Sequence, residues 1–177
     1  MALELNGTTG VSLVQDGVVT AADLAAGAVT QGITEFDLYY LDTDVSTSNT
    51  DLTSWTRIHK SGTGITNSGA QFTFPSTGLY LVSWHCAFIS GGNDGSIMVY
   101  GSLSTDGGSN FGDYGYCRTG QSDPISCHAS TQQTINVTNS SNFIFKLYTS
   151  SFSAGTYVIG GPVKDTIISF IRIGDSV

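Results

Sequence analysis

Three histidines, His59, His85 and His128, are the side chains of this sequence best suited to proton transfer or metal binding. An enzyme needs an acid, a base or a nucleophile that converge on one site, and the sequence has no hydrolase, metalloprotease, phosphate-binding or dinucleotide-binding motif. His85 lies in an otherwise apolar stretch, so we expect a core or interface histidine with a hydrogen-bond partner. His128 follows Cys127, but no second pair at ligand spacing accompanies it. We therefore expect a protein without enzymatic activity and without a zinc site.

Acidic residues in two polar stretches could supply oxygen ligands to a calcium ion. Asp42 and Asp44 precede Asp51 in the first stretch, and Asp106 and Asp113 lie in the second. Calcium prefers carboxylate and carbonyl oxygens carried by flexible loops. The alternative, which the acidic composition favours, is that these carboxylates are simply solvated.

The stretch 110–116, Asn-Phe-Gly-Asp-Tyr-Gly-Tyr, is the strongest candidate for surface recognition. Exposed aromatic rings beside carboxylates and amides suit stacking on sugar rings and hydrogen bonding to their hydroxyls. The candidate residues are Phe111, Asp113, Tyr114 and Tyr116. The alternative is that these aromatic residues belong to an ordinary strand and face the core.

The three cysteines, Cys86, Cys117 and Cys127, are an odd number without a close pair. Cys86 lies in the apolar stretch that contains His85, which predicts a buried thiol. Cys117 and Cys127 could either form a disulfide across a loop or remain thiols. Residues 1–6 lack the basic and apolar regions of a secretion signal, so we expect synthesis in a reducing cytoplasm, which favours thiols.

Composition limits the classes of partner. Charged residues make up 11% of the chain, against roughly 25% in typical soluble domains, and 22 glycines accompany many serines and threonines. This composition is typical of an all-β protein with many turns. The net charge of −8 argues against nucleic-acid binding, which needs a basic surface. Because no apolar run approaches the ~20 residues that span a bilayer, we expect no membrane insertion.

The stretch 72–88 is the clearest strand of the sequence. Pro75 sets φ for a turn, Gly78 permits its exit, and a long run of β-forming residues follows. The residues on both of its faces are apolar for most of its length. In a strand with one face in water, apolar and polar residues alternate instead. Both faces of this strand are therefore expected to be covered.

The last strand, 166–173, has the same two apolar faces. Further strands are expected at 36–41, 52–59, 96–104, 126–137 and 142–148. The segment 65–74 is expected to lead into the turn at Pro75, and a loop is expected at 118–124. Turn signals recur every 8 to 12 residues without a helical period, which indicates a sandwich of antiparallel sheets. A small sandwich has one inner face to bury, so a second apolar face predicts a subunit interface. The candidates for the core or the subunit interface are Tyr80, Val82, Trp84, Ile168 and Phe170.

Residues 1–33 contain no aromatic side chain, unlike the rest of the chain. They are therefore expected to form a separate extended arm. Their runs Asn-Gly-Thr-Thr-Gly-Val-Ser-Leu-Val-Gln-Asp-Gly-Val-Val and Ala-Asp-Leu-Ala-Ala-Gly-Ala-Val-Thr resemble segments of tail-fibre and other virion proteins of tailed bacteriophages. The resemblance implies a stem that attaches to a particle or forms a trimer.

The run Phe72-Thr73-Phe74-Pro75-Ser76-Thr77-Gly78-Leu79-Tyr80 resembles the F-x-x-P-x-x-G-x-Y signature of the C1q/tumour-necrosis-factor jelly-roll family. The terminal Thr-Ile-Ile-Ser-Phe-Ile-Arg-Ile-Gly is similar to the final strand of that family. The resemblance covers residues 35–175 and implies a jelly-roll head, placed here at 34–177, that forms a compact homotrimer and binds through surface loops. Residues 91–127 depart from the pattern, and members of the family sometimes carry calcium.

These observations lead to one functional hypothesis with two alternatives. The first is a non-enzymatic, homotrimeric virion protein of a tailed phage, a short fibre or adhesin whose arm attaches to other virion proteins and whose head contacts a host-surface glycan or receptor. The second is a capsid decoration or head-fibre protein that stabilises the shell. The third is a glycan-active enzyme, since carboxylates that pair only in space leave no motif. The first two place the protein in the virion after assembly in the host cytoplasm.

Overall fold

The computed structural model describes residues 33–92, 94–121 and 126–177, and within them the chain forms two antiparallel β-sheets. The expected all-β antiparallel sandwich is confirmed. The described strands are β1 Phe36–Leu41, β2 Trp55–Ser61, β3 Thr66–Ser68, β4 Gln71–Thr73, β5 Gly78–Ile89, β6 Asp94–Ser104, β7 Gly112–Gln121, β8 Ser126–Val137, β9 Ile144–Ser150, β10 Tyr157–Val158 and β11 Ile167–Gly174. The expected arm, 1–33, lies outside this part of the chain except for its last residue. No helix of the described residues is long and apolar enough to cross a membrane.

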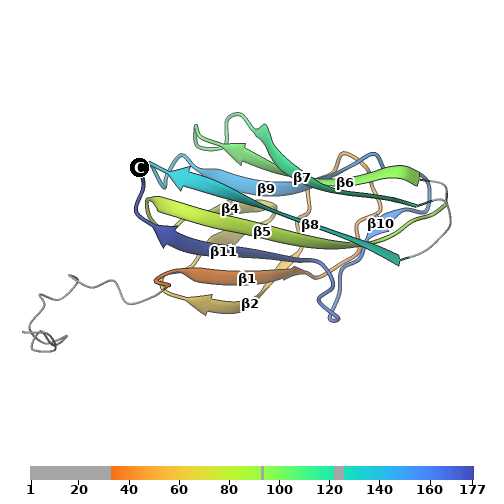
Figure 1. Cartoon of the computed structure of the whole chain (residues 1–177), viewed down its shortest axis with the longest axis horizontal. Helices are drawn as coiled ribbons and strands as arrows, with labels where there is room; N and C mark the ends of the chain where they lie inside the picture. Colours follow the sequence, from red (N-terminus) through yellow and green to blue (C-terminus); the bar gives the residue numbers. More distant parts are fainter. Residues whose placement is uncertain (1–32, 93, 122–125) are drawn as a thin grey trace, which may run out of the picture. The chain divides into compact units, whose positions relative to one another are not determined.

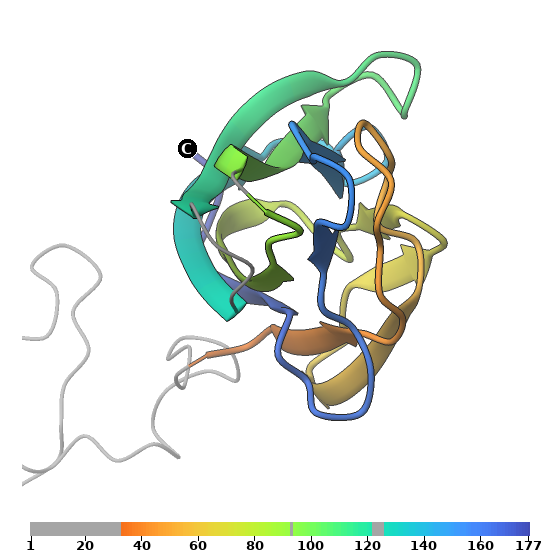
Figure 2. The ribbon, with the colours of Figure 1, turned by 90° about the vertical axis from the view of Figure 1, so that its right-hand side faces the viewer.

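The first sheet has the strand order β10-β5-β11-β1-β2, and β8 pairs with β5. Its long central strands lie side by side in Figure 1. The second sheet has the order β3-β4-β9-β6-β7. Figure 2 views the same strands from one end, with the two layers around the core. Because many neighbours in both sheets, such as β5 and β11 or β6 and β9, are far apart in sequence, the arrangement of surface side chains depends on long-range pairing.

Strand β5 is the centre of the core because its inward side chains are large and fully covered. Tyr80, Val82 and Trp84 are buried, and Ile168 and Phe170 of the neighbouring β11 are buried beside them. The structure thus places all five core or interface candidates in the core between the sheets. Any interface on this sheet must use the opposite parity, which includes Leu79 and Leu81.

Aromatic side chains dominate the contact between the two sheets. Phe72 of β4 packs with ring centroids 5.3 Å from Tyr39 and 5.1 Å from Phe170. Trp84 lies against Phe145 of β9 at 5.6 Å, directly below Gly101. A Cβ added at Gly101 would lie 2.6 Å from the Phe145 ring and 2.8 Å from Trp84, so a glycine is required for this aromatic packing.

Three strand boundaries differ from the sequence-based expectation. The segment 65–74 was expected to lead directly into the turn at Pro75, but it folds into the β3–β4 hairpin, whose turn contains Gly69 with φ of 59°. The strand expected at 52–59 begins at Trp55, because the buried Leu52 instead donates its backbone N–H to Leu147. The prediction that a loop begins at Arg118 is wrong, because β7 continues to pair with β6 as far as residue 121.

A charged side chain is buried in the first sheet. The Asp37 carboxylate on β1 is fully covered and forms an ion pair with Arg57 of β2, with Oδ1 and Nε 2.8 Å apart. Its Oδ2 accepts the backbone N–H of Ile65 at 2.5 Å, and the Arg57 guanidinium also donates to Tyr39 and to the Ile65 carbonyl. Burial raises the pKa of Asp37, while the Ile65 hydrogen bond and Arg57 lower it. The pair ties β1 and β2 to the segment that leads into β3.

Candidate functional site

The outer face of the first sheet carries an apolar line that a single chain leaves partly uncovered. Cross-strand register aligns Phe36 of β1, Ile171 of β11, Leu81 of β5 and Thr134 of β8. The three apolar members of this line are half-buried, whereas the inward neighbours on the same strands are fully buried. This is the second apolar face that the sequence predicted on both strands, and the described part of a single chain leaves it half-exposed.

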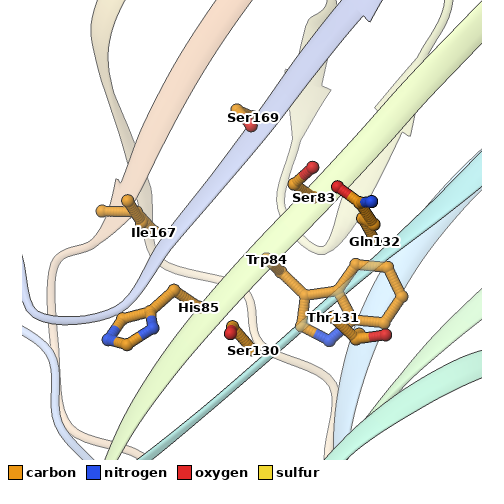
Figure 3. Close-up of a pocket in the computed structure, with 8 residues that line it drawn as sticks. All are labelled: Ser83, Trp84, His85, Ser130, Thr131, Gln132, Ile167 and Ser169. Atoms are coloured by element: carbon orange, nitrogen blue, oxygen red, sulfur yellow. The ribbon is translucent and has the colours of Figure 1, made fainter.

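A shallow depression of about 390 Å³ lies beside this line. Small side chains line it, because register places Ser169, Ser83 and Gln132 in the next row across β11, β5 and β8. The following row contains Ile167, His85 and Ser130. Figure 3 shows these lining residues, together with Trp84 and Thr131, on the three strands. The depression therefore combines hydroxyl and amide groups with one imidazole at its end.

His85 and His128 lie together on this outer face. The Nε2 atom of His85 is 3.3 Å from Nδ1 of His128, and the ring centroids are 5.3 Å apart. Burial lowers the pKa of His85, as does the neighbouring His128, and Asp165 opposes both effects. The expected hydrogen-bond partner of His85 is thus His128, which the sequence did not pair with it. The third histidine, His59, packs on Phe36 at 5.6 Å and lies apart from this pair.

The calcium candidates do not form a common site in the described part of the chain. Asp44 Oδ1 accepts the backbone N–H of Gly160 at 2.8 Å, and Asp51 forms an ion pair with Lys146 at 2.9 Å. Within the described residues, no group of three or more His, Cys, Asp or Glu side chains is arranged to hold a metal ion, and Asp42 does not join one.

Asp106 of the second acidic stretch has a structural role in its turn. Hydrogen bonds from the Asn110 side chain and backbone and from Ser104 lower the pKa of Asp106 to about 2. The carboxylate therefore stays ionised at neutral pH and holds the turn between β6 and β7.

The three cysteines are thiols in the structure. Cys86 and Cys117 are buried in the core, and burial, followed by the neighbouring Cys117, raises the pKa of Cys86. The alternative disulfide between Cys117 and Cys127 is not formed. The buried indole N–H of Trp84 has no hydrogen-bond partner among the described residues.

A row of three tyrosines crosses the outer face of the second sheet. Register aligns Tyr148 of β9, Tyr100 of β6 and Tyr116 of β7. The Tyr100 ring is 5.2 Å from Tyr148 in a stacked arrangement and 5.3 Å from Tyr116, tilted by 45°. The Tyr148 hydroxyl donates to Asp113 Oδ1 at 2.8 Å. We call Tyr100, Tyr116, Tyr148 and Asp113 the tyrosine row.

The four surface-recognition candidates separate into two groups. Asp113 and Tyr116 belong to the tyrosine row, and Phe111 lies at its margin beneath the Lys146 ammonium, 4.5 Å from its ring centroid. Tyr114 instead reaches toward the first sheet, where its hydroxyl donates to the Thr134 carbonyl at 2.8 Å. Tyr100 and Tyr148 were missed, because only the pairing of β6 with β7 and β9 brings them to this surface.

Comparison with known proteins shows similarity of fold without similarity of sequence. No protein-family model matches the chain, and no curated protein matches it. Among solved structures, Eiger TNF from S. frugiperda superposes with a TM-score of 0.64 at 12% identity, over 82% of this chain and 96% of that one.

Two further structures give the same result. Murine APRIL has a TM-score of 0.59 at 14% identity, over 78% of this chain and 98% of its own. The globular domain of zebrafish complement 1qA has a TM-score of 0.57 at 10% identity, over 82% of this chain and 100% of its own. The strand order and these superpositions together establish that the described part of the chain has the C1q/TNF-like jelly-roll fold.

Proposed function

We propose that this chain is a non-enzymatic, homotrimeric attachment protein of a tailed phage, a short fibre or adhesin. Residues 1–33 attach it to other virion proteins, and the jelly roll contacts the host surface. The observation that carries the trimer is the half-buried apolar line on the outer face of the first sheet, because burial in a neighbouring copy would cover it. The phage origin rests on the resemblance of residues 1–33 to fibre segments, and the recognition role on the exposed tyrosine row.

Two measurements on the full chain test this proposal. Light scattering at micromolar concentration is expected to give about three times the 18.6 kDa mass of one chain, and a stable monomer would contradict the trimer. Immunogold labelling of intact particles is expected to mark the tail or its fibres. Labelling spread over the capsid shell would instead support the decoration protein.

The folded chain is expected to lose stability as the pH falls through about 6.5, the ordinary pKa of histidine. The pKa of His85 is lowered in the folded chain by burial and by His128, so protons bind the unfolded or exposed imidazole more readily. The free energy of unfolding is therefore highest above the ordinary pKa of histidine and decreases as the pH falls below it. The negative charge of Asp165 makes this decrease smaller. The melting temperature should drop between pH 7.5 and 5.5, and His85→Gln should reduce that drop. An equal drop in wild type and variant would contradict this role for His85.

A further inference from the structure

We propose that the tyrosine row is a binding site for uncharged carbohydrate. This inference rests on the proposed attachment function and specifies the class of ligand that the head would contact. It concerns the second sheet, whereas the proposed subunit contact uses the outer face of the first sheet. A ligand on this surface would therefore leave the apolar line of the first sheet available for assembly.

One ring of the tyrosine row, Tyr116, is exposed and lies next to the stacked pair Tyr100 and Tyr148. Tyr116 is 48% exposed, and its strand β7 ends the strand order of the second sheet among the described strands. On its inner side it meets Tyr100, which is in turn stacked on Tyr148 with an angle of 14° between the rings. This support restrains the Tyr116 ring, so that less side-chain freedom is lost when a ligand stacks on its exposed face.

Two hydrogen-bonding groups of the row, the Tyr148 hydroxyl and the Asp113 carboxylate, are bonded to each other. Burial, followed by the hydrogen bond to Asp113, raises the pKa of Tyr148 to about 12. The phenol therefore remains protonated at neutral pH and orients the exposed Asp113 carboxylate. A carboxylate fixed beside an aromatic ring can accept two neighbouring hydroxyl groups while the ring packs on the C–H face of a sugar.

The local charge favours a neutral ligand over an acidic one. The chain carries a net charge of −8, which disfavours polyanions in general. Around the row, the acids Asp51 and Asp113 are balanced by Lys146 and Arg118. Lys146 is already engaged by Asp51 at 2.9 Å and lies over the Phe111 ring. The surface is thus aromatic and rich in hydrogen-bonding groups, but close to neutral.

A protein partner fits this surface less well than a sugar. The tyrosine rings are followed in the next register row by the charged side chains of Lys146 and Asp113, which flank the buried Ser102. Protein interfaces of useful affinity have a central apolar region that excludes water. Sugars instead present apolar faces and hydroxyls at short intervals, which matches the alternation here. In a trimer, three such sites would bind one polysaccharide together, so the overall affinity would exceed that of a single weak site.

The test is electrophoresis of the full chain in native gels that contain dextran, mannan or galactomannan, with parallel gels that contain alginate or heparin. We expect retardation by at least one neutral polysaccharide, and we expect Tyr116→Ala to weaken it at least about fivefold. Tyr116→Phe keeps the ring and is expected to retain most of the binding. Val163→Ala, which changes an exposed side chain in a loop outside the second sheet, is expected to bind as the wild type does.

Light scattering of each protein separates the two proposals. A trimer that no neutral polysaccharide retards would overturn the carbohydrate site and leave the assembly proposal standing. A trimer retarded only by the acidic polysaccharides would have the same two consequences. Unchanged binding by Tyr116→Ala would also overturn the site. A monomer that is still retarded in a Tyr116-dependent way would support the carbohydrate site and contradict the trimer.

Discussion

Replacing Leu81 with aspartate is expected to convert the trimer into monomers without unfolding the jelly roll. Leu81 is half-buried in a single chain and lies in register with Ile171 on β11. If a second copy covers this line, the new carboxylate loses its water and gains no partner, a cost of several kcal/mol in each of the subunit contacts. In an isolated chain the same carboxylate stays solvated on the outer face. Light scattering should then give the mass of one chain, and circular dichroism should retain the β-sheet spectrum.

The matched control introduces the same charge on the other sheet. Met98 is half-buried on the outer face of β6, so Met98→Asp adds an aspartate to a comparable sheet position away from the proposed interface. This variant is expected to remain trimeric. A trimeric Leu81→Asp protein, or a monomeric Met98→Asp protein, would show that the subunits do not meet through the first sheet.

Replacing Arg57 with methionine is expected to lower the free energy of unfolding at pH 7 by about 2–3 kcal/mol. The substitution leaves the fully buried Asp37 carboxylate with the Ile65 backbone N–H but without its counter-charge. The estimate lies below the range for a fully buried pair because the Arg57 side chain is 39% exposed and water screens part of the attraction. Denaturant unfolding monitored by tryptophan fluorescence measures the difference.

The pH dependence of this variant identifies the cause. The pKa of Asp37 is already raised by burial, and removing Arg57 removes a group that lowers it. A carboxyl group whose folded-state pKa lies above its unfolded value gains stability as the pH falls toward 3.8, so the deficit of Arg57→Met should be smaller at pH 5 than at pH 7. Asp175→Asn breaks the exposed pair with Arg172 and should change stability by less than about 1 kcal/mol. A deficit independent of pH would attribute the effect to lost packing of the arginine stem.

The sequence predicted the long strands well because their signal is local. β1 and β8 match the expected strands at both ends, and β5 and β11 differ from them by a few residues. Alternation of apolar and polar residues along β1 and the dense apolar run of β5 are properties of neighbouring residues. β7 was cut short because its glycines and charged side chains lack that alternation, and only its pairing with β6 shows that it continues.

The functional surfaces could not be predicted because they depend on register between distant strands. Residues 85 and 128 meet only once β5 pairs with β8, and the tyrosine row needs three strands in one alignment. The same holds for Asp37 and Arg57, which the sequence shows merely as charged residues in or near strands. What the sequence did contain was the two-faced apolar character of β5, although only the structure shows which parity faces outward.

The position of β1 between β11 and β2 has a mechanical consequence under the proposed attachment through residues 1–33. A pull on the start of β1 acts along the strand, and hydrogen bonds to both neighbours resist it together. Such a force acts on the hydrogen bonds to both neighbouring strands at once, rather than breaking one bond after another. The Asp37–Arg57 ion pair adds a further link between β1 and β2 near the end where the force acts. Under the proposed attachment we therefore expect the jelly roll to resist tension applied at the start of β1.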